Sequence, residues 1–187
     1  MKNALLILTF LIALAVPALA QSSQVADFSL TDTSGKTVSL NDMKGPNGVV
    51  LIFVSAQCPV VRGYNERMNE LAAAYKAKGI NVVGINSNVT ESPDQIKAHA
   101  EATYKFPVLI DKGSVIADKL GANVTPEAYF LDAKNNLLYH GAIDNDRSGA
   151  NVTEHFLTAA FDSSLAGRKI ERASANAFGC TIKRSVE

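Results

Sequence analysis

The sequence predicts one α/β domain with a mixed central sheet, helices on both faces of that sheet and a β-hairpin at its N-terminal end. Two continuous apolar, β-rich runs, VVLIFVS at residues 49–55 and INVVGIN at residues 80–86, are typical of central strands covered on both faces. A segment with helical spacing separates the two runs, which is the order of a β-α-β unit. The later strands read as an antiparallel hairpin, so we expect a mixed sheet.

The first elements follow from local patterns. Residues 28–40 (FSLTDTSGKTVSL) alternate in character on both sides of a Ser-Gly turn, which predicts the N-terminal hairpin. After the first central strand we expect a helix over residues 61–78, closed by Gly79. Its apolar residues recur at steps of four, three and four and so form one helical face: Tyr64, Met68, Leu71 and Tyr75.

The second half is expected to continue the alternation and then turn antiparallel. Ser92, Pro93 and Gln95 make a strong helix start, with a serine cap and a proline in the first turn. The remaining elements are expected to be a helix to about residue 104, an extended segment at 106–111, a short helix at 114–120, strands at 127–132 and 137–143, and a last helix at 153–165 capped by Asn151 or Thr153. The polar segment 141–149 is expected to be a solvated loop.

Residues 1–20 have the composition of a secretory signal peptide. Lys2 precedes an apolar run that ends in Ala-Leu-Ala, which is a small-residue cleavage site. A membrane anchor is the alternative, because the run is at the short end of the ~17–25 residues that span a bilayer. We therefore expect residues 21–187 to form the domain, exported to the periplasm or secreted, with no stable membrane anchor after cleavage.

Charge and composition exclude several classes of partner. The chain has 18 basic and 18 acidic residues and no basic stripe, so nucleic acid is not an expected partner. Its histidines, His99, His140 and His155, have no metal-ligand spacing, and we predict neither a metal nor a cofactor. The two cysteines, Cys58 and Cys180, are too few for a disulfide scaffold and are either one structural bridge or a redox couple.

Cys58 occupies the position at which chemistry is expected. It follows a central strand and precedes a helix, so it lies at the carboxyl edge of the predicted sheet. Free amides at the helix start and the helix dipole favour the thiolate, and Arg62 would add positive charge. A thiolate is the nucleophile in disulfide exchange and in peroxide reduction. The alternative is a small buried hydrophobic residue, which many cysteines are.

Three segments carry a resemblance to a known family: the opening at residues 26–45, the strand into Cys58-Pro59, and Thr125-Pro126 before a strand. The chain resembles the thioredoxin superfamily, and more narrowly the redoxin branch that includes peroxiredoxins of the alkyl hydroperoxide reductase type. The resemblance implies a three-layer thioredoxin-like fold and a thiol-dependent oxidoreductase. It also implies that Pro126 is cis, faces Cys58 and, with Thr125, holds an extended substrate; a trans proline opening the strand is the alternative.

The chain departs from the family patterns in two ways. Val61 stands where thioredoxins have their second cysteine, so Cys58 cannot form a local disulfide. Ser55 matches the hydroxyl position of the peroxiredoxin motif, but Leu51 replaces its leading proline, and Arg62 and Arg147 are both candidates for its arginine. Some redoxins resolve the reactive cysteine with one near the C-terminus, which is a role open to Cys180. Resolution within the chain, resolution between chains and a permanent bridge all remain open.

The function expected from these features is an exported thiol–disulfide oxidoreductase. Cys58 and Cys180 are its expected catalytic residues, and Thr125, Pro126, Ser55 and Arg62 are its expected substrate-binding residues. Its partners would be a protein disulfide or thiol, or a small peroxide, together with an unidentified thiol reductant. A peroxiredoxin-like thiol peroxidase and a redox-inert binding module of the same fold are the alternatives.

Overall fold

The computed structural model describes residues 24–185, in which an eight-stranded mixed sheet has the order β2-β1-β5-β4-β3-β7-β8-β9. The predicted signal peptide, residues 1–20, lies outside the described residues. The strands of this sheet are β1 Ser29–Asp32, β2 Thr37–Ser39, β3 Gly48–Phe53, β4 Ile80–Asn86, β5 Val108–Ile110, β7 Glu127–Leu131, β8 Leu137–Gly141 and β9 Ser174–Ala175. The parallel core β3-β4-β5 and the antiparallel hairpin β7-β8 confirm the predicted mixed sheet.

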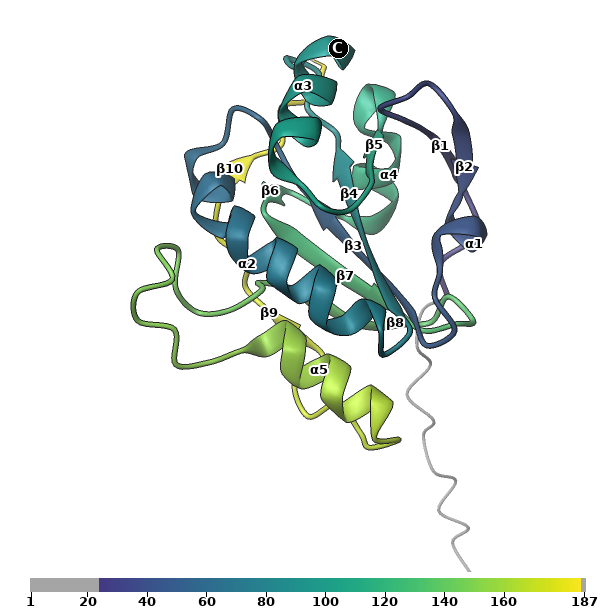
Figure 1. The fold of residues 1–187 in the computed structure, drawn as a ribbon, viewed down its shortest axis with the longest axis vertical. Helices are drawn as coiled ribbons and strands as arrows, with labels where there is room; N and C mark the ends of the chain where they lie inside the picture. Colours follow the sequence, from purple (N-terminus) through teal and green to yellow (C-terminus); the bar gives the residue numbers. More distant parts are fainter. Residues whose placement is uncertain (1–23, 186–187) are drawn as a thin grey trace, which may run out of the picture.

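Helices cover both faces of the sheet, as predicted. They are α1 Leu40–Met43, α2 Pro59–Lys76, α3 Pro93–Thr103, η1 Lys112–Ser114, α4 Val115–Leu120 and α5 Phe156–Leu165. Buried side chains of α2, α3 and α5 pack on one face, and those of α1 and α4 pack on the other. Figure 1 shows α2 and α5 side by side in front of the sheet, where Tyr75 and Phe161 make an edge-on ring contact.

Strand β3 shows why its sequence is continuously apolar. All six of its residues are buried, and successive side chains enter opposite cores. Val50 and Ile52 belong to the core under α2, whereas Leu51 and Phe53 belong to the core under α4. The strand is therefore covered on both faces, and the segment that follows it emerges at one edge of the sheet.

The last helix begins later than predicted, and its predicted cap is wrong. Helix α5 starts at Phe156, and the residue before it, His155, makes no capping hydrogen bond from its side chain. The side-chain oxygen of Asn145 instead accepts hydrogen bonds from the amides of Thr153 and Glu154, each at 3.0 Å. A contact from the preceding loop thus holds residues 153–154 outside the helix.

The C-terminal segment contains two short strands that the sequence pattern does not predict. Strand β9 joins the edge of the main sheet beside β8, and β10 (Cys180–Thr181) pairs antiparallel with β6 (Val124–Thr125). Gly141 has a φ of 124°, and a Cβ there would overlap the carbonyl oxygen of Ala175, so the junction with β9 requires glycine. Figure 1 shows the yellow C-terminal segment crossing to the start of α2.

Candidate functional site

Cys58 sits at the junction between β3 and α2, as the sequence predicts. It is the residue immediately before the helix, Pro59 is the first helical residue, and the Arg62 amide donates to the Cys58 carbonyl at 3.3 Å. The side chain of Cys58 is only 2% exposed. Cys58 is therefore enclosed at the carboxyl edge of the sheet, next to the free amides of a helix start.

Cys58 is joined to Cys180 by a disulfide bond within the same chain. The two Cα atoms are 5.9 Å apart, which lies within the range of bridged cysteines. The bond connects residues separated by 122 positions in the sequence. Of the arrangements left open by the sequence, the structure contains the link within one chain.

The Thr125-Pro126 peptide bond is cis, which confirms that prediction. The sulfur of Cys58 lies 3.3 Å from the carbonyl oxygen of Thr125, so this loop faces Cys58. The same residue is paired with Cys180, whose carbonyl oxygen accepts a 3.5 Å hydrogen bond from the Thr125 hydroxyl. The structure thus brings together Cys58, Cys180, Thr125 and Pro126.

Ser55 approaches the site through a buried carboxylate that sequence reasoning missed. Its hydroxyl donates to Glu91, which is 6% exposed and lies in the loop after β4. Glu91 also accepts hydrogen bonds from the amides of Ala56 at 2.9 Å and Gln57 at 3.3 Å, the two residues directly before Cys58. The side chain of Asn86 donates to the same carboxylate at 2.8 Å. Glu91 therefore fixes the loop that presents the cysteine.

One sequence signal points to Glu91 in retrospect. It follows β4, which is parallel to β3, so its loop and the Cys58 loop emerge at the same edge of the sheet. The neighbouring segment Ser92-Pro93 reads as a helix start, and that local pattern gives no sign that the acid before it is buried. The role of Glu91 depends on its hydrogen bond with the amide of Ala56, which lies 35 residues earlier in the sequence.

The two candidate arginines lie on neighbouring segments, because a Cβ on Gly63, the residue after Arg62, would come within 2.9 Å of the Arg147 carbonyl oxygen. Arg62 is exposed on α2. Burial, the largest cause, and the positive charge of Arg62 lower the pKa of His99, whereas the Glu91 carboxylate raises it. The Arg147 guanidinium lies 5.3 Å from the ring centre of Phe178. The hydroxyl of Ser55, the third residue of the motif considered with these arginines, donates to the Glu91 carboxylate.

The loop that carries Arg147 is more ordered than the predicted solvated loop. Asp144 is 3% exposed and forms an ion pair with Arg67. It also accepts a 2.8 Å hydrogen bond from the Tyr64 hydroxyl, and burial and this bond raise the Tyr64 pKa. The prediction of a solvated loop is therefore wrong at Asp144, because its charge is paired with a helix that the local sequence does not reveal.

Residues beyond Cys180 hold the C-terminal segment in place independently of the disulfide. Ile182 is 2% exposed and packs in the core on the α4 side of the sheet. Its amide donates to the carbonyl of Asn123 at 2.9 Å, and Arg184 forms a 2.6 Å ion pair with Asp118. These anchors have no signal in the sequence pattern, and they position Cys180 beside the cis peptide bond.

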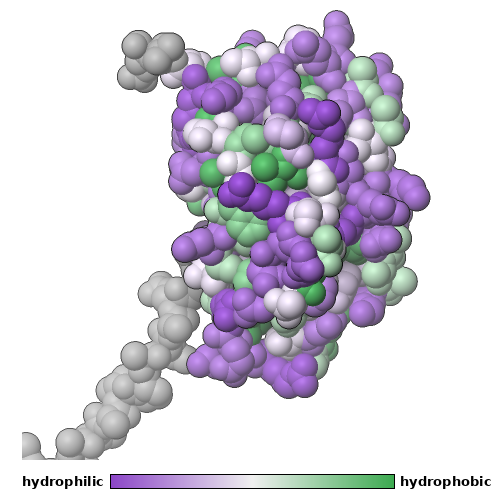
Figure 2. Space-filling view, turned by 90° about the vertical axis from the view of Figure 1, so that its left-hand side faces the viewer, coloured by the Kyte–Doolittle hydropathy of each residue, from purple (hydrophilic) through white to green (hydrophobic). Residues whose placement is uncertain are grey.

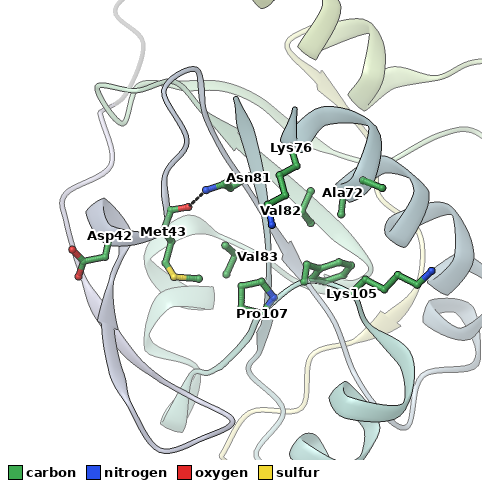
Figure 3. Close-up of a pocket in the computed structure, with 11 residues that line it drawn as sticks. Asp42, Met43, Ala72, Lys76, Asn81, Val82, Val83, Lys105 and Pro107 are labelled. Atoms are coloured by element: carbon green, nitrogen blue, oxygen red, sulfur yellow. Dashed lines mark hydrogen bonds between the residues drawn. The ribbon is translucent and has the colours of Figure 1, made fainter. Parts of the chain in front are cut away.

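A separate hollow of about 380 Å³ lies at the opposite end of α2, far from Cys58 along the helix. Figure 3 shows Met43, Val83 and Pro107 around it, with Lys76 and Lys105 at its margin, and the Asn81 side chain donates to the Met43 carbonyl at 2.8 Å. Ala72 and Lys76, from the last turns of α2, line it. This hollow has no part in the cysteine site.

Two further observations concern metals and membranes. Between residues 24 and 185, no group of three or more His, Cys, Asp or Glu side chains is arranged to hold a metal ion. Among the helices of that same part of the chain, none has the length and apolar character needed to cross a bilayer.

Comparison with known proteins places these features in a family context. Residues 22–140 match the family model described as AhpC/TSA family. A crystal structure of a hypothetical protein from Sinorhizobium meliloti is 31% identical, with a TM-score of 0.81, and the match covers 91% of this chain and 97% of that one. An uncharacterized conserved protein from Geobacillus kaustophilus is 33% identical, with a TM-score of 0.82 and coverage of 89% and 93%.

Curated relatives include a protein named thiol-disulfide oxidoreductase ResA from Bacillus anthracis, which is 32% identical over 109 residues. The match covers 58% of this chain and 62% of the relative, so the chain spans less than two thirds of that protein's length. A more distant match is the crystal structure of a putative thiol:disulfide interchange protein DsbE from Chlorobium tepidum, which is 23% identical with a TM-score of 0.64. The match covers 79% of this chain and 99% of that one, and it shows the fold alone.

Proposed function

Because the chain belongs to the AhpC/TSA family, we propose that it is an exported thiol–disulfide oxidoreductase in which Cys58 and Cys180 form one redox pair. The observation that carries the proposal is the Cys58–Cys180 bond at a helix start, beside the cis Thr125-Pro126 bond. Curated relatives named thiol-disulfide oxidoreductase support the same chemistry. The pair replaces the local dithiol that Val61 makes impossible.

The proposed reaction transfers two electrons from the reduced pair to a target disulfide. The Cys58 thiolate attacks one target sulfur, forms a mixed disulfide and expels the other target sulfur as a thiolate. The Cys180 thiolate then attacks the Cys58 sulfur, which releases the second target thiolate and leaves the Cys58–Cys180 bond. A dithiol reductant restores the pair by the same exchange, and becomes a disulfide itself.

The surrounding residues have positioning roles in this proposal. Thr125 and Pro126 present a backbone edge against which the target peptide lies. Ser55 acts through Glu91, which holds the amides before Cys58. Arg62 contributes positive charge near the helix start but is exposed, so its effect on the thiolate is expected to be weakened by solvent.

Export is the second part of the proposal, and it rests on the composition of residues 1–20. An oxidising compartment is where a disulfide of this kind persists between turnovers. A fusion of residues 1–20 to a reporter that is active only outside the cytoplasm tests this part. Export of the reporter is expected, and its retention in the cytoplasm would contradict the localisation.

Trapping of the mixed disulfide tests the chemistry. The reduced Cys180→Ser protein, mixed with a protein that contains an accessible disulfide, is expected to accumulate a covalent complex through Cys58. Wild-type protein should release the reduced target instead, and Cys58→Ser should do neither. Non-reducing electrophoresis with mass spectrometry reads all three results. Absence of a complex with Cys180→Ser, under conditions in which free thiols react, would refute the proposed function.

A further inference from the structure

The C-terminal segment of residues 176–181 lies between two fixed points. On one side, the Ala142 amide donates to the Ala175 carbonyl at 3.1 Å, which secures β9 to the main sheet. On the other side, Ile182 is buried and Arg184 is paired with Asp118. We call residues 176–181 the strap. Its anchors do not depend on the disulfide, so after reduction the strap is held at both ends and, between them, by the pairing of Cys180 and Thr181 with Thr125 and Val124.

The strap lies in the place where a target cysteine must lie in the proposed reaction. Cys180 is bonded to Cys58 and is paired with Thr125, and Thr181 is paired with Val124. An extended polypeptide that forms a mixed disulfide with Cys58 beside the cis-proline loop needs the same sulfur and the same backbone edge. The oxidised protein therefore holds a segment of its own chain in that position.

Gly179, the residue before Cys180, has no room for a side chain. A Cβ added to Gly179 would overlap the carbonyl oxygen of Thr125, and would also crowd the nitrogen of Pro126 at 3.2 Å. Both contacts are with backbone, so a side-chain rotation cannot relieve them. Gly179 does not have a positive φ, so this glycine is required by the close approach and not by its backbone conformation.

Phe178, two residues before Cys180, makes an aromatic contact. The ring centre of Phe178 is 6.4 Å from that of Tyr64 on α2, and the Arg147 guanidinium covers the Phe178 ring at 5.3 Å. Tyr64 is fixed by its hydrogen bond to Asp144. The Tyr64 ring and the Arg147 guanidinium together make a site that favours an aromatic side chain.

The outer surface on the side of β10 carries both apolar and hydrophilic side chains. Figure 2 views the molecule from the side on which β10 and the start of α2 lie in Figure 1. Apolar side chains form a patch in the upper half of this face, and hydrophilic side chains border the patch. An extended chain, whose side chains alternate in direction, can contact both kinds of surface.

We propose that the strap is an internal substitute for the target, and that the target is a polypeptide whose reactive cysteine follows an aromatic residue and a glycine. This inference rests on the proposed function, and it adds the sequence class of the substrate. Before a target binds, the strap must leave the Thr125 edge, which requires reduction of the Cys58–Cys180 bond. The oxidised protein is thus closed to targets, and in the reduced protein the strap and a target compete for the Thr125 edge.

A peptide comparison tests the proposal with the reduced, full-length Cys180→Ser protein. A peptide that copies residues 176–182 is activated as a mixed disulfide with 5-thio-2-nitrobenzoate. Attack of the Cys58 thiolate on the peptide sulfur forms the Cys58–peptide disulfide and releases coloured 5-thio-2-nitrobenzoate. A second peptide has alanine in the glycine position, and a third has alanine in the phenylalanine position. The small symmetrical disulfide of the same nitrobenzoate serves as the reagent without peptide contacts.

The peptide with the unchanged sequence is expected to react about tenfold faster or more than the peptide with alanine in the glycine position, because the overlap with Thr125 must be relieved. The peptide that lacks the phenylalanine ring should be slowed less. Equal rates for all three peptides would overturn this inference and leave the proposed function intact, provided that Cys58 reacts rapidly with the small disulfide. Slow reaction with every reagent, at the rate of a free thiol, would overturn both.

A variant of the strap gives a second test, of whether the strap competes with the target for the Thr125 edge. Adding Gly179→Ala to Cys180→Ser should displace the protein's own strap and so raise the rate with the copied peptide, without changing the rate with the small disulfide. Thr181→Ala is the matched control, since Thr181 is exposed in the same strap. A Gly179→Ala rate equal to that of the control would contradict the claim that the strap competes with the target. The peptide comparison stands without this variant if it fails to fold.

Discussion

Replacement of Glu91 by glutamine tests how the buried carboxylate controls Cys58. Its two oxygens accept from Ser55, Ala56, Gln57 and Asn86. A glutamine can keep the oxygen that faces Ala56 and Asn86 and turn its amide group toward the Ser55 hydroxyl, which is able to accept. The hydrogen bond with Ser55 is then reversed and the 3.3 Å bond from the Gln57 amide is lost, although this amide keeps its 3.2 Å bond to the Ser55 hydroxyl. The expected cost in the free energy of unfolding is therefore modest, about 1–3 kcal/mol.

The larger expected effect is on the acidity of the thiol in the reduced protein. Glu91 contacts the amide of the residue before Cys58, so its charge lies within about 10 Å of the sulfur on backbone dimensions. At an effective dielectric constant of about 20, a charge at that distance disfavours the thiolate by roughly 1.7 kcal/mol. Glu91→Gln should therefore lower the Cys58 thiol pKa by about one unit.

The rate of alkylation of the reduced Cys180→Ser protein, measured against pH with and without Glu91→Gln, gives this pKa. The matched control is Glu70→Gln, because Glu70 is exposed and lies on α2, 12 residues after Cys58. That control should leave the thiol pKa unchanged, since the separation along a helix is about 18 Å. An unchanged or raised pKa in Glu91→Gln would refute the proposed electrostatic role of this carboxylate.

The remaining predictions concern stability. Reduction of the disulfide should lower the free energy of unfolding by up to about 5 kcal/mol, because it opens a loop of 122 residues. Urea unfolding with and without reductant measures the difference. Equal stability in the two conditions would contradict a disulfide that is formed in solution. Ile182→Ala should cost about 2–5 kcal/mol, against little change for the exposed Ser185→Ala, and a cost below 1 kcal/mol would remove Ile182 as an anchor. Burial lowers the His99 pKa, so the unfolded state binds more protons, and stability should fall as the pH drops below about 6.5. Urea unfolding at two pH values should show a smaller fall in His99→Gln, and an equal fall would contradict the assignment.

The sequence predicts the centre of this fold well because the information there is local. Continuous apolar runs identify β3 and β4, and the helical face of α2 is visible in the spacing of Tyr64 and Met68. The strand–cysteine–helix junction follows directly from these elements. Predicting these elements requires only neighbours along the chain, and so does predicting that Cys58 lies at the junction between β3 and α2.

The parts that were missed depend on contacts between distant segments. Ile182 and Gly179 owe their roles to the Thr125 loop more than 50 residues earlier in the sequence, and β10 contains only two residues, which is too short for a recognisable pattern. Glu91 lies in a polar loop whose burial is produced by packing against the Ser55 segment. The cysteine count predicts that Cys180 is bridged to Cys58 or forms a redox couple with it, but the pairing of Cys180 with Thr125 has no local signal.

The reduction potential of the Cys58–Cys180 bond is the most direct test of the claim that these cysteines form a working pair. Equilibration of the wild-type protein in dithiothreitol buffers, followed by alkylation and mass spectrometry, gives the fraction that is bonded at each potential. A redox pair predicts a potential above about −300 mV, in the range of exchange proteins. A potential well below this value, typical of permanent structural disulfides, would contradict the claim.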